Sequence, residues 1–443
     1  MRDRLSVLHI TPHLGGGIGR VLLGYLAKVK NDDRFIHQVS CLDYANDDAV
    51  AAAAEIGITL TDKMHMHRQK LLSIIGEADI VLLHWINHPL IYDFIVREVL
   101  PPCRLIVWSH ISGFYPPYVF TEKILSYPDL FVFTSPISYE VKDIHNLPNE
   151  LRSKLRVVWS TGGVGHVKDV KCKRHEGFNV GYIGTVDYVK MHPNYLRMCA
   201  NVRVPYVRFI VCGGTKEIEL QKESARMGIS DKFWFTGFVS DIAQYLEVFD
   251  VFGYPLAPYH YGTCDQVLAE SMACGVVPVV LANPMEKYMV EDRVTGLVAV
   301  NEDEYCDAIE ELYGNKKLRV FLSKNAKEYA CEEFTLRRVE LEWNKIFGEV
   351  IQIPKTVRKW DNCQPRITAK DVFLESLGLY GREFQVYCNA TTIQDREMSA
   401  IRIQNMEPYP IWQARTKGSV HHYNYFFPEE PFLAEWSRLM RGY

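Results

Sequence analysis

FNVGYIGTV, residues 178–186, is the stretch that decides the fold, because it starts a strand-and-helix pattern for the second time. It follows GGVGHVKDVKCKRHEG at 162–177, a polar segment rich in glycine and lysine that is typical of a linker. Short apolar runs alternate with helical patterns both before this linker and after it. A repeated alternation in a chain of 443 residues predicts two domains of similar architecture.

The first half of the chain carries strand patterns separated by amphipathic helices such as 19–30 and 90–100. Strands that are apolar along their whole length predict a parallel sheet covered by helices on both faces. The predicted fold class is therefore α/β, with a doubly wound, Rossmann-like sheet. The expected strands are 5–11, 37–43, 79–85, 104–110, 130–135 and 155–160.

The second half repeats the pattern and is closed by the helical stretch 316–348. The alternation then stops, so we predict domains at 1–170 and 171–350 and a C-terminal appendage, helical in part, at 351–443. The expected strands of the second half are 178–186, 207–214, 232–239, 251–256, 276–282 and 296–300.

Composition excludes several classes of protein. The net charge of −4 gives no overall basic footprint, so we expect no nucleic-acid partner. The eleven cysteines include no CxxC pair, which favours reduced thiols in a cytoplasmic protein. No run of 18 apolar residues predicts a membrane span, and the apolar run at the N-terminus is too short for a signal peptide. Peripheral attachment to the inner face of a membrane stays open.

A glycine cluster follows the first predicted strand and opens a helix. Gly16 and Gly17 let the backbone approach a ligand closely, and the amides of a helix N-terminus favour an anion. The cluster resembles a dinucleotide fingerprint with Asp43 as its acid, but Arg20 stands where the third glycine is required. A dehydrogenase is therefore disfavoured, and a plain strand-to-helix turn remains the alternative.

Three histidines of the first half lie at strand ends. His110 ends the run RLIVWS, and His13 and His84 hold similar positions. Ligands of an open parallel sheet bind outside the carboxyl ends of its strands, which favours a polar site here. A hydrogen-bonded structural histidine is the alternative for each of them.

In the second half, Lys190 follows a strand and a glycine turn, near the start of a helix. A cation is unfavourable beside a helix N-terminus, and an anionic ligand shared by the lysine and the amides would resolve that conflict. A solvated loop lysine is the alternative. Gly213 and Gly214 form a second strand-end turn.

Glu270 lies in VLAESMACG, a helical pattern of small and apolar residues that stops at Gly275. Burying this acid costs several kcal/mol unless its oxygens accept hydrogen bonds. Sugar hydroxyls are suitable donors. The chain has no D-x-D pair, phosphate loop, G-x-S-x-G or HExxH motif, so we expect no metal site.

Four segments in the same order resemble the retaining nucleotide-sugar glycosyltransferases of family 4 (group 1), whose GT-B fold has two Rossmann-like domains facing across a cleft. The resemblance is strongest over 178–300, weaker over 1–165, and absent from the last ninety or so residues. The segments are VGYIGTVDYVKMHPN, RFIVCGG, FTGFVSDIAQYLEVFDVFGYPL and GTCDQVLAESMACGVVPVV.

The resemblance implies transfer of a sugar, with retention and without a metal or other cofactor, from a nucleoside diphosphate sugar to a glycan, lipid-linked or small-molecule acceptor. It implies that Glu270 holds the ribose as the second acid of the E-x7-E motif, and that Lys190 contacts the diphosphate. It implies that His110 lies near the transferred sugar and that the Gly16–Gly17 loop approaches the diphosphate. The other donor-binding residues it implies are Gly184, Thr185, Gly213, Gly214, Gly262, Thr263, Asp265 and Val267.

Two positions depart from the family pattern. Gly262 stands where the first acid of E-x7-E is expected, and Thr185 replaces the usual arginine. Asp265, three residues further on, is a candidate substitute for the missing acid. A catalytically impaired sugar-nucleotide-binding subunit and a GT-B sugar-nucleotide epimerase therefore remain alternatives.

Overall fold

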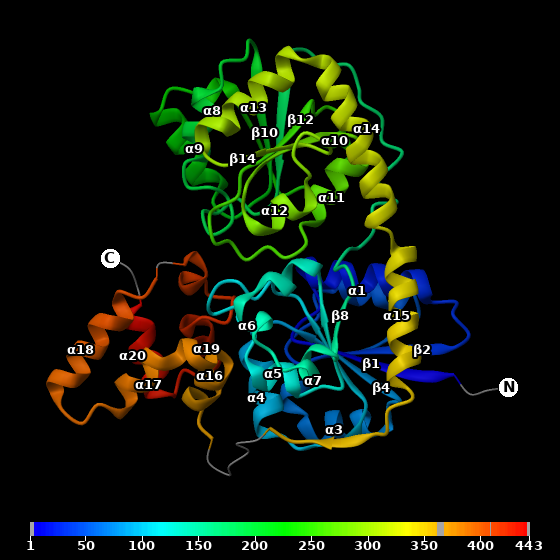
Figure 1. The fold of residues 1–443 in the computed structure, drawn as a ribbon, viewed down its shortest axis with the longest axis vertical. Helices are drawn as coiled ribbons and strands as arrows, with labels where there is room; N and C mark the ends of the chain where they lie inside the picture. The colour runs from blue at the N-terminus through cyan, green and yellow to red at the C-terminus, as the bar shows by residue number, and fades with distance from the viewer. Residues whose placement is uncertain (1–3, 361–366, 408, 441–443) are drawn as a thin grey trace. The chain divides into compact units, whose positions relative to one another are not determined.

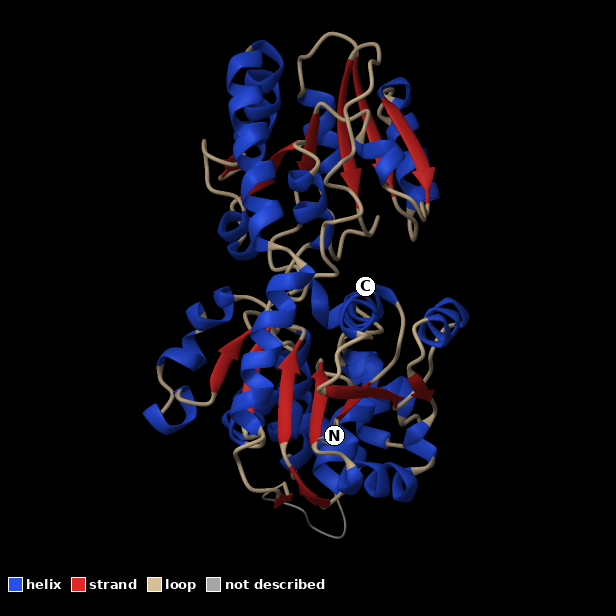
Figure 2. Cartoon of the chain, turned by 90° about the vertical axis from the view of Figure 1, so that its right-hand side faces the viewer, coloured by secondary structure: helices blue, strands red, loops and turns tan. Residues whose placement is uncertain are grey.

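The structure is a computed structural model that describes residues 4–360, 367–407 and 409–440. The chain divides into two compact units. Unit 1 consists of Met1–Gly162 and Val339–Tyr443, and unit 2 of Gly163–Arg338. Each unit has its own parallel sheet with helices packed around it (Figures 1 and 2).

The sheet of unit 1 has seven strands, and all of its neighbouring pairs are parallel. Its central strand β4 is buried along its whole length, as expected for a strand covered on both faces. In spatial order the strands are β3 (Thr59–Thr61), β2 (Phe35–Cys41), β1 (Leu5–Thr11), β4 (Ile80–Trp85), β6 (Leu105–Ser109), β7 (Leu130–Phe133) and β8 (Leu155–Val157).

The helices of unit 1 before the linker are α1 (Gly16–Val29), α2 (Asp47–Glu55), α3 (Arg68–Glu77), α4 (Pro89–Arg97), α5 (Glu122–Ser126), α6 (Lys142–His145) and α7 (Asn149–Arg152). Short 3-10 turns lie at η1 (Met64–Met66) and η2 (Pro136–Glu140).

The sheet of unit 2 has six parallel strands. In spatial order they are β11 (Phe233–Gly237), β10 (Val207–Cys212), β9 (Phe178–Ile183), β12 (Val251–Tyr254), β13 (Val277–Leu281) and β14 (Leu297–Ala299). The helices are α8 (Tyr195–Asn201), α9 (Glu217–Arg226), α10 (Ala243–Leu246), α11 (Gln266–Ala273), α12 (Pro284–Met289), α13 (Glu302–Gly314) and α14 (Lys316–Glu333), with the 3-10 turn η3 (Ser230–Lys232).

These two sheets confirm the predicted α/β class, and all twelve expected strands are present with ends that shift by a few residues. Three short strands were not predicted: β3, β5 (Leu100–Cys103) and β15 (Thr356–Arg358). Strand β5 contains Pro101 and Pro102, and proline argues against a strand inside a sheet. It pairs with β15 alone, in a separate antiparallel ribbon.

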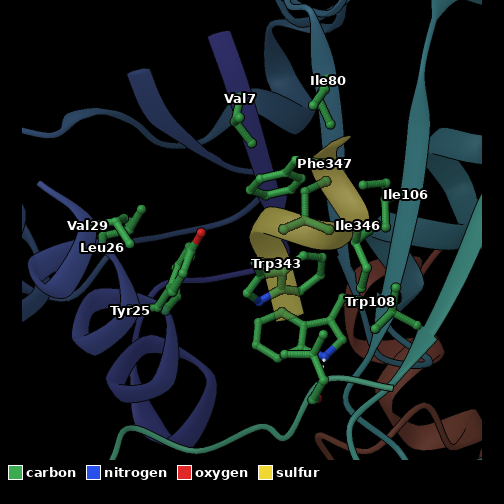
Figure 3. Packing of buried hydrophobic residues seen from close by; sticks show 14 of the residues in the cluster. Val7, Tyr25, Leu26, Val29, Ile80, Ile106, Trp108, Trp343, Ile346 and Phe347 are labelled. Atoms are coloured by element: carbon green, nitrogen blue, oxygen red, sulfur yellow. Dashed lines mark hydrogen bonds between the residues drawn. The ribbon is translucent and has the colours of Figure 1, made fainter. Parts of the chain in front are cut away.

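Helix α15 (Leu336–Val350) fills the core of unit 1, although the sequence placed the stretch 316–348 with the second half. Trp343 and Phe347 on its buried face join the cluster that includes Val7, Ile106 and Trp108 (Figure 3). The ring centroids of Trp343 and Trp108 lie 5.0 Å apart, edge to face. The amphipathic period of α15 predicts a buried face but does not say which sheet it covers.

The C-terminal appendage is a cluster of helices that belongs to unit 1. Helices α16 and α19 contact α4. The aromatic rings of Phe373, Phe384, Tyr423 and Trp436 pack together inside the cluster. The elements are α16 (Ala369–Leu377), η4 (Gly378–Gly381), α17 (Arg382–Asn389), α18 (Ile393–Gln404), η5 (Pro410–Gln413), α19 (Val420–Phe426) and α20 (Pro431–Leu439). Among the described residues, no helix combines the length and apolar character needed to cross a membrane.

Candidate functional site

The strand order of unit 2 predicts where a ligand binds, at the carboxyl ends of its strands. Strands β9 and β12 are neighbours, and the chain moves outward from them in opposite directions. In open α/β sheets, ligands bind outside the carboxyl ends of the strands at such a switch point. Lys190 follows β9, Asp265 follows β12, and Glu286 follows β13.

Two glycine turns lie side by side at these strand ends. A side chain at Gly213 would put its Cβ 1.9 Å from the carbonyl oxygen of Gly184, so this close approach of two backbones requires glycine. The Val186 amide donates to the carbonyl of Gly214 at 3.2 Å, and the carbonyl of Thr185 accepts from the Tyr182 hydroxyl at 2.9 Å. The predicted residues of both turns therefore form one hydrogen-bonded surface.

Lys190 is a largely buried cation paired with a buried acid. Its Nζ donates to Asp265 Oδ1 at 2.7 Å and lies 5.7 Å and 6.0 Å from the ring centroids of Tyr254 and Tyr261. Burial opposes the charge on Lys190, but Asp265, Tyr261 and Tyr182 together outweigh it and hold the lysine pKa above its usual value. Burial raises the pKa of Asp265, but Lys190, Glu286 and His260 together lower it below its usual range.

His260 and Glu286 extend this pair into a buried cluster. His260 Nε2 lies 2.9 Å from Glu286 Oε2, and His260 Nδ1 accepts from the Gly262 amide at 2.9 Å. A Cβ at position 262 would lie 2.8 Å from His260 Cε1 and 2.9 Å from Asp265 Oδ2. The space that the first acid of E-x7-E would need is therefore occupied by the side chains of Asp265 and His260.

Glu270 lies on α11 and is fully buried. Its Oε1 accepts from Gln266 Nε2 at 3.0 Å and is 3.2 Å from His166 Nε2. Its Oε2 has no hydrogen-bond partner among the described residues. A buried carboxylate oxygen without a donor is costly, and hydroxyl groups of a ligand would satisfy it. Two further predicted residues, Thr263 before the helix and Val267 on it, are half-buried.

The remaining predicted residues belong to unit 1. His110 follows β6, and both of its ring nitrogens are engaged: Nε2 is 3.1 Å from His84 Nδ1, and Nδ1 is 3.2 Å from Ser160 Oγ. Burial lowers its pKa to about 3, so the ring is neutral at physiological pH. Gly16 and Gly17 begin α1 and are exposed, with no atom within 4 Å of a Cβ at either position.

The histidines of the first sheet form a chain that the sequence did not reveal. His84 Nε2 is 2.9 Å from His9 Nδ1, and His9 Nε2 is 2.9 Å from His37 Nδ1. With His110, one histidine comes from or directly after each of four neighbouring strands, β2, β1, β4 and β6. Their spacing in sequence carries no signal, because the contacts join residues 26 to 75 positions apart.

Sequence reasoning also missed Glu286, Gln266 and His166. An acid in the first turn of a helix that follows a strand was an available signal for Glu286. The described part of the chain contains no group of three or more His, Cys, Asp or Glu side chains that could hold a metal ion.

Residues 168–329 match the model of the family described as glycosyl transferases group 1. The matched residues lie within unit 2, so this unit carries the similarity to that family. The family resemblance predicted from the four sequence segments is confirmed, and Lys190, Asp265, Glu270 and Glu286 all lie within the glycosyltransferase domain. A comparison with curated protein sequences gives no significant match.

Solved structures of similar fold include HepE from Anabaena in complex with UDP, with a TM-score of 0.62 at 17% identity, over 78% of this chain and 100% of that one. A glycosyltransferase from Rickettsia africae gives a TM-score of 0.64 at 11% identity, over 79% and 99% of the two chains. The lipopolysaccharide outer core galactosyltransferase WaaB, in its apo form, gives 0.59 at 14% identity, over 78% and 100%. These similarities confirm the GT-B-like fold.

Proposed function

We propose that the protein transfers a sugar from a nucleoside diphosphate sugar to an acceptor, with retention of configuration and without a metal ion. The observation that carries the proposal is the buried Lys190 at the switch point of a group 1 glycosyltransferase domain. Departure of a nucleoside diphosphate builds up negative charge, and a positioned cation in a poorly solvated site stabilises that charge. Lys190 supplies such a cation.

Glu270 and the glycine turns supply the rest of the donor site in this proposal. The unpartnered Oε2 of Glu270 accepts from ribose hydroxyls, while Gly184, Thr185, Gly213 and Gly214 give the donor a backbone surface without bulky side chains. HepE has been solved with UDP and with UDP-glucose, so UDP-sugars are the first donors to test.

Unit 1 supplies His110 and the Gly16–Gly17 turn, which the resemblance places near the transferred sugar and the diphosphate, and in this proposal it also binds the acceptor. His110 and the open Gly16–Gly17 turn lie at the carboxyl ends of its strands, where an open sheet binds ligands. Both nitrogens of His110 are engaged, so contact with a transferred sugar requires a sugar hydroxyl to replace Ser160 at Nδ1. A glycan or a lipid-linked glycan is the proposed acceptor class. The proposed location of the protein is the cytoplasm, with peripheral attachment to the inner face of a membrane.

A panel of nucleoside diphosphate sugars, screened by thermal stabilisation of the full chain, tests the donor site, since a bound ligand raises the unfolding temperature by mass action. We expect a UDP-sugar to stabilise the protein and release of UDP to follow when an acceptor is added. If none of the donors raises the unfolding temperature, the proposal is contradicted. Gly262 in place of an acid favours a second candidate, a binding subunit, which would bind the donor without turnover.

A further inference from the structure

The cluster of Lys190, His260, Asp265 and Glu286 contains two groups that the proposed reaction does not use. His260 and Glu286 are fully buried titratable side chains, and they come from the segments that follow β12 and β13. Burial of ionisable groups is costly unless each is paired or neutral. The hydrogen bonds of the cluster show which form each group takes.

His260 is neutral, with its proton on Nε2. The backbone amide of Gly262 donates to Nδ1, so this nitrogen carries a lone pair. The single ring proton is therefore on Nε2, which donates to Glu286 Oε2. Burial lowers the pKa of His260, but Glu286 and Asp265 together raise it above its ordinary value. A charged ring, however, would direct a second N–H at the Gly262 amide.

One proton lies between Glu286 and Asp265. Glu286 Oε1 and Asp265 Oδ2 are buried and receive no donor from any described N–H or O–H group, yet the two carboxyls are in hydrogen-bond contact. Two ionised carboxylates repel each other at this range, so the pair holds a proton.

The proton belongs to Glu286. Asp265 Oδ1 accepts from Lys190 at 2.7 Å and from the Tyr254 hydroxyl at 3.2 Å, and both donors favour an ionised Asp265. Among the described residues, Glu286 has only the neutral His260 as a donor, and burial raises its pKa. With Lys190 positive, Asp265 negative and the other two neutral, the buried cluster carries no net charge.

We propose that Glu286 is a neutral carboxylic acid that donates to Asp265 and thereby positions the Asp265–Lys190 pair for the donor. This inference rests on the proposed function. When a diphosphate takes over Lys190, Asp265 remains held by Glu286 and Tyr254 while its Oδ1 is freed from the lysine. Asp265, beside the glycine that replaces the motif's first acid, then accepts a hydrogen bond from a hydroxyl of the donor sugar.

Glu286→Gln replaces the carboxyl group with an amide that cannot ionise. Its amide keeps both contacts, because the carbonyl oxygen accepts from His260 and the N–H donates to Asp265. Glu286→Ala removes both contacts. Glu302→Gln is the matched control, since Glu302 accepts from Asn194, the residue before α8 in the same unit.

Infrared spectra of the unliganded full chain at pH 7, compared between the wild type and each variant and between H₂O and D₂O, test directly whether Glu286 carries the proton. We expect a carbonyl stretch of a protonated carboxyl that shifts in D₂O, is absent from Glu286→Gln and persists in Glu302→Gln. Absence of the band from the wild type, or its persistence in Glu286→Gln, overturns the proposal. This readout does not depend on donor binding or on turnover.

Calorimetric titration with UDP tests the positioning role. We expect Glu286→Gln to bind within about threefold of the wild type and Glu286→Ala about tenfold more weakly, since a buried carboxylate that loses a donor is costly. Unchanged affinity in a folded Glu286→Ala overturns the positioning role. If the wild type binds no nucleoside diphosphate, the proposed function fails, while the infrared band still decides whether Glu286 carries the proton.

Discussion

At the scale of single residues, Lys190 is the group on which the proposed chemistry depends most directly. Replacing it with alanine removes the cation that faces the leaving diphosphate. We expect Lys190→Ala to lower kcat/KM by about two powers of ten, or about 3 kcal/mol of transition-state stabilisation. Steady-state transfer kinetics with a UDP-sugar measure this effect. Lys173→Ala is the control, because Lys173 forms an exposed ion pair with Glu247 in the same unit; equal rates for both variants would refute the role.

A substitution at Gly262 tests whether the packing leaves room for a side chain where the first acid of E-x7-E is expected. An alanine Cβ there would lie within 3 Å of His260 and Asp265, so one of these buried side chains must shift. We expect Gly262→Ala to lower the free energy of unfolding by about 1–3 kcal/mol, a cost typical of overpacking. Denaturant titration measures it against Gly314→Ala, where no atom lies within 4 Å of the new Cβ. Equal stability of the two variants would show that the pocket tolerates a side chain.

At the scale of elements, the histidine chain couples four strands of unit 1. Each contact joins Nδ1 of one ring to Nε2 of the next, and each neutral ring has one proton. Either every ring carries its proton on Nδ1 or every ring carries it on Nε2. We therefore expect His9, His37, His84 and His110 to share one tautomer, which nitrogen-15 spectra of labelled imidazoles measure. A mixture of tautomers, or a charged ring at neutral pH, would disprove the coupling.

The same chain of histidines predicts that unit 1 loses stability in acid. Burial lowers the pKa of His37 to about 4 and of His110 to about 3, below the ordinary value of 6.5. As pH falls below about 6.5 the unfolded chain binds these protons first, so the free energy of unfolding drops by up to about 1.4 kcal/mol per pH unit for each ring. Above about pH 6.5 the neutral rings make their full contribution to the free energy of unfolding. His37→Phe should flatten this slope, whereas Tyr25→Phe, which removes no group titrating in this range, should keep it.

Elements with a strong local pattern were predictable, and contacts between elements were not. The apolar run of β4 and the glycine that stops α11 mark those elements from sequence alone. The strand-end position of Lys190 and the helical pattern around Glu270 likewise identified them as candidates. The pairing of Asp265 with Glu286 joins the ends of two different strands, so no local spacing carries it.

At the scale of the whole molecule, the chain leaves unit 1 at Gly162 and returns to it at Val339, so unit 1 is incomplete until α15 has been made. Trp343 is the largest side chain that α15 contributes to that core, where it packs against Trp108 and, at 5.4 Å between ring centroids, Phe347. Removing a buried tryptophan costs about 3–5 kcal/mol, which is a large part of the stability of a domain.

We therefore expect Trp343→Ala to lower the unfolding midpoint of unit 1 while UDP still protects unit 2, because the donor-site residues lie within Gly163–Arg338. Denaturant titrations followed by circular dichroism, with and without UDP, separate the two transitions. Trp234→Ala is the control, since Trp234 on β11 is nearly half exposed and its loss should cost little. A single transition that Trp343→Ala shifts equally with and without UDP would mean that the units unfold together, because stabilisation of one is then shared by the other.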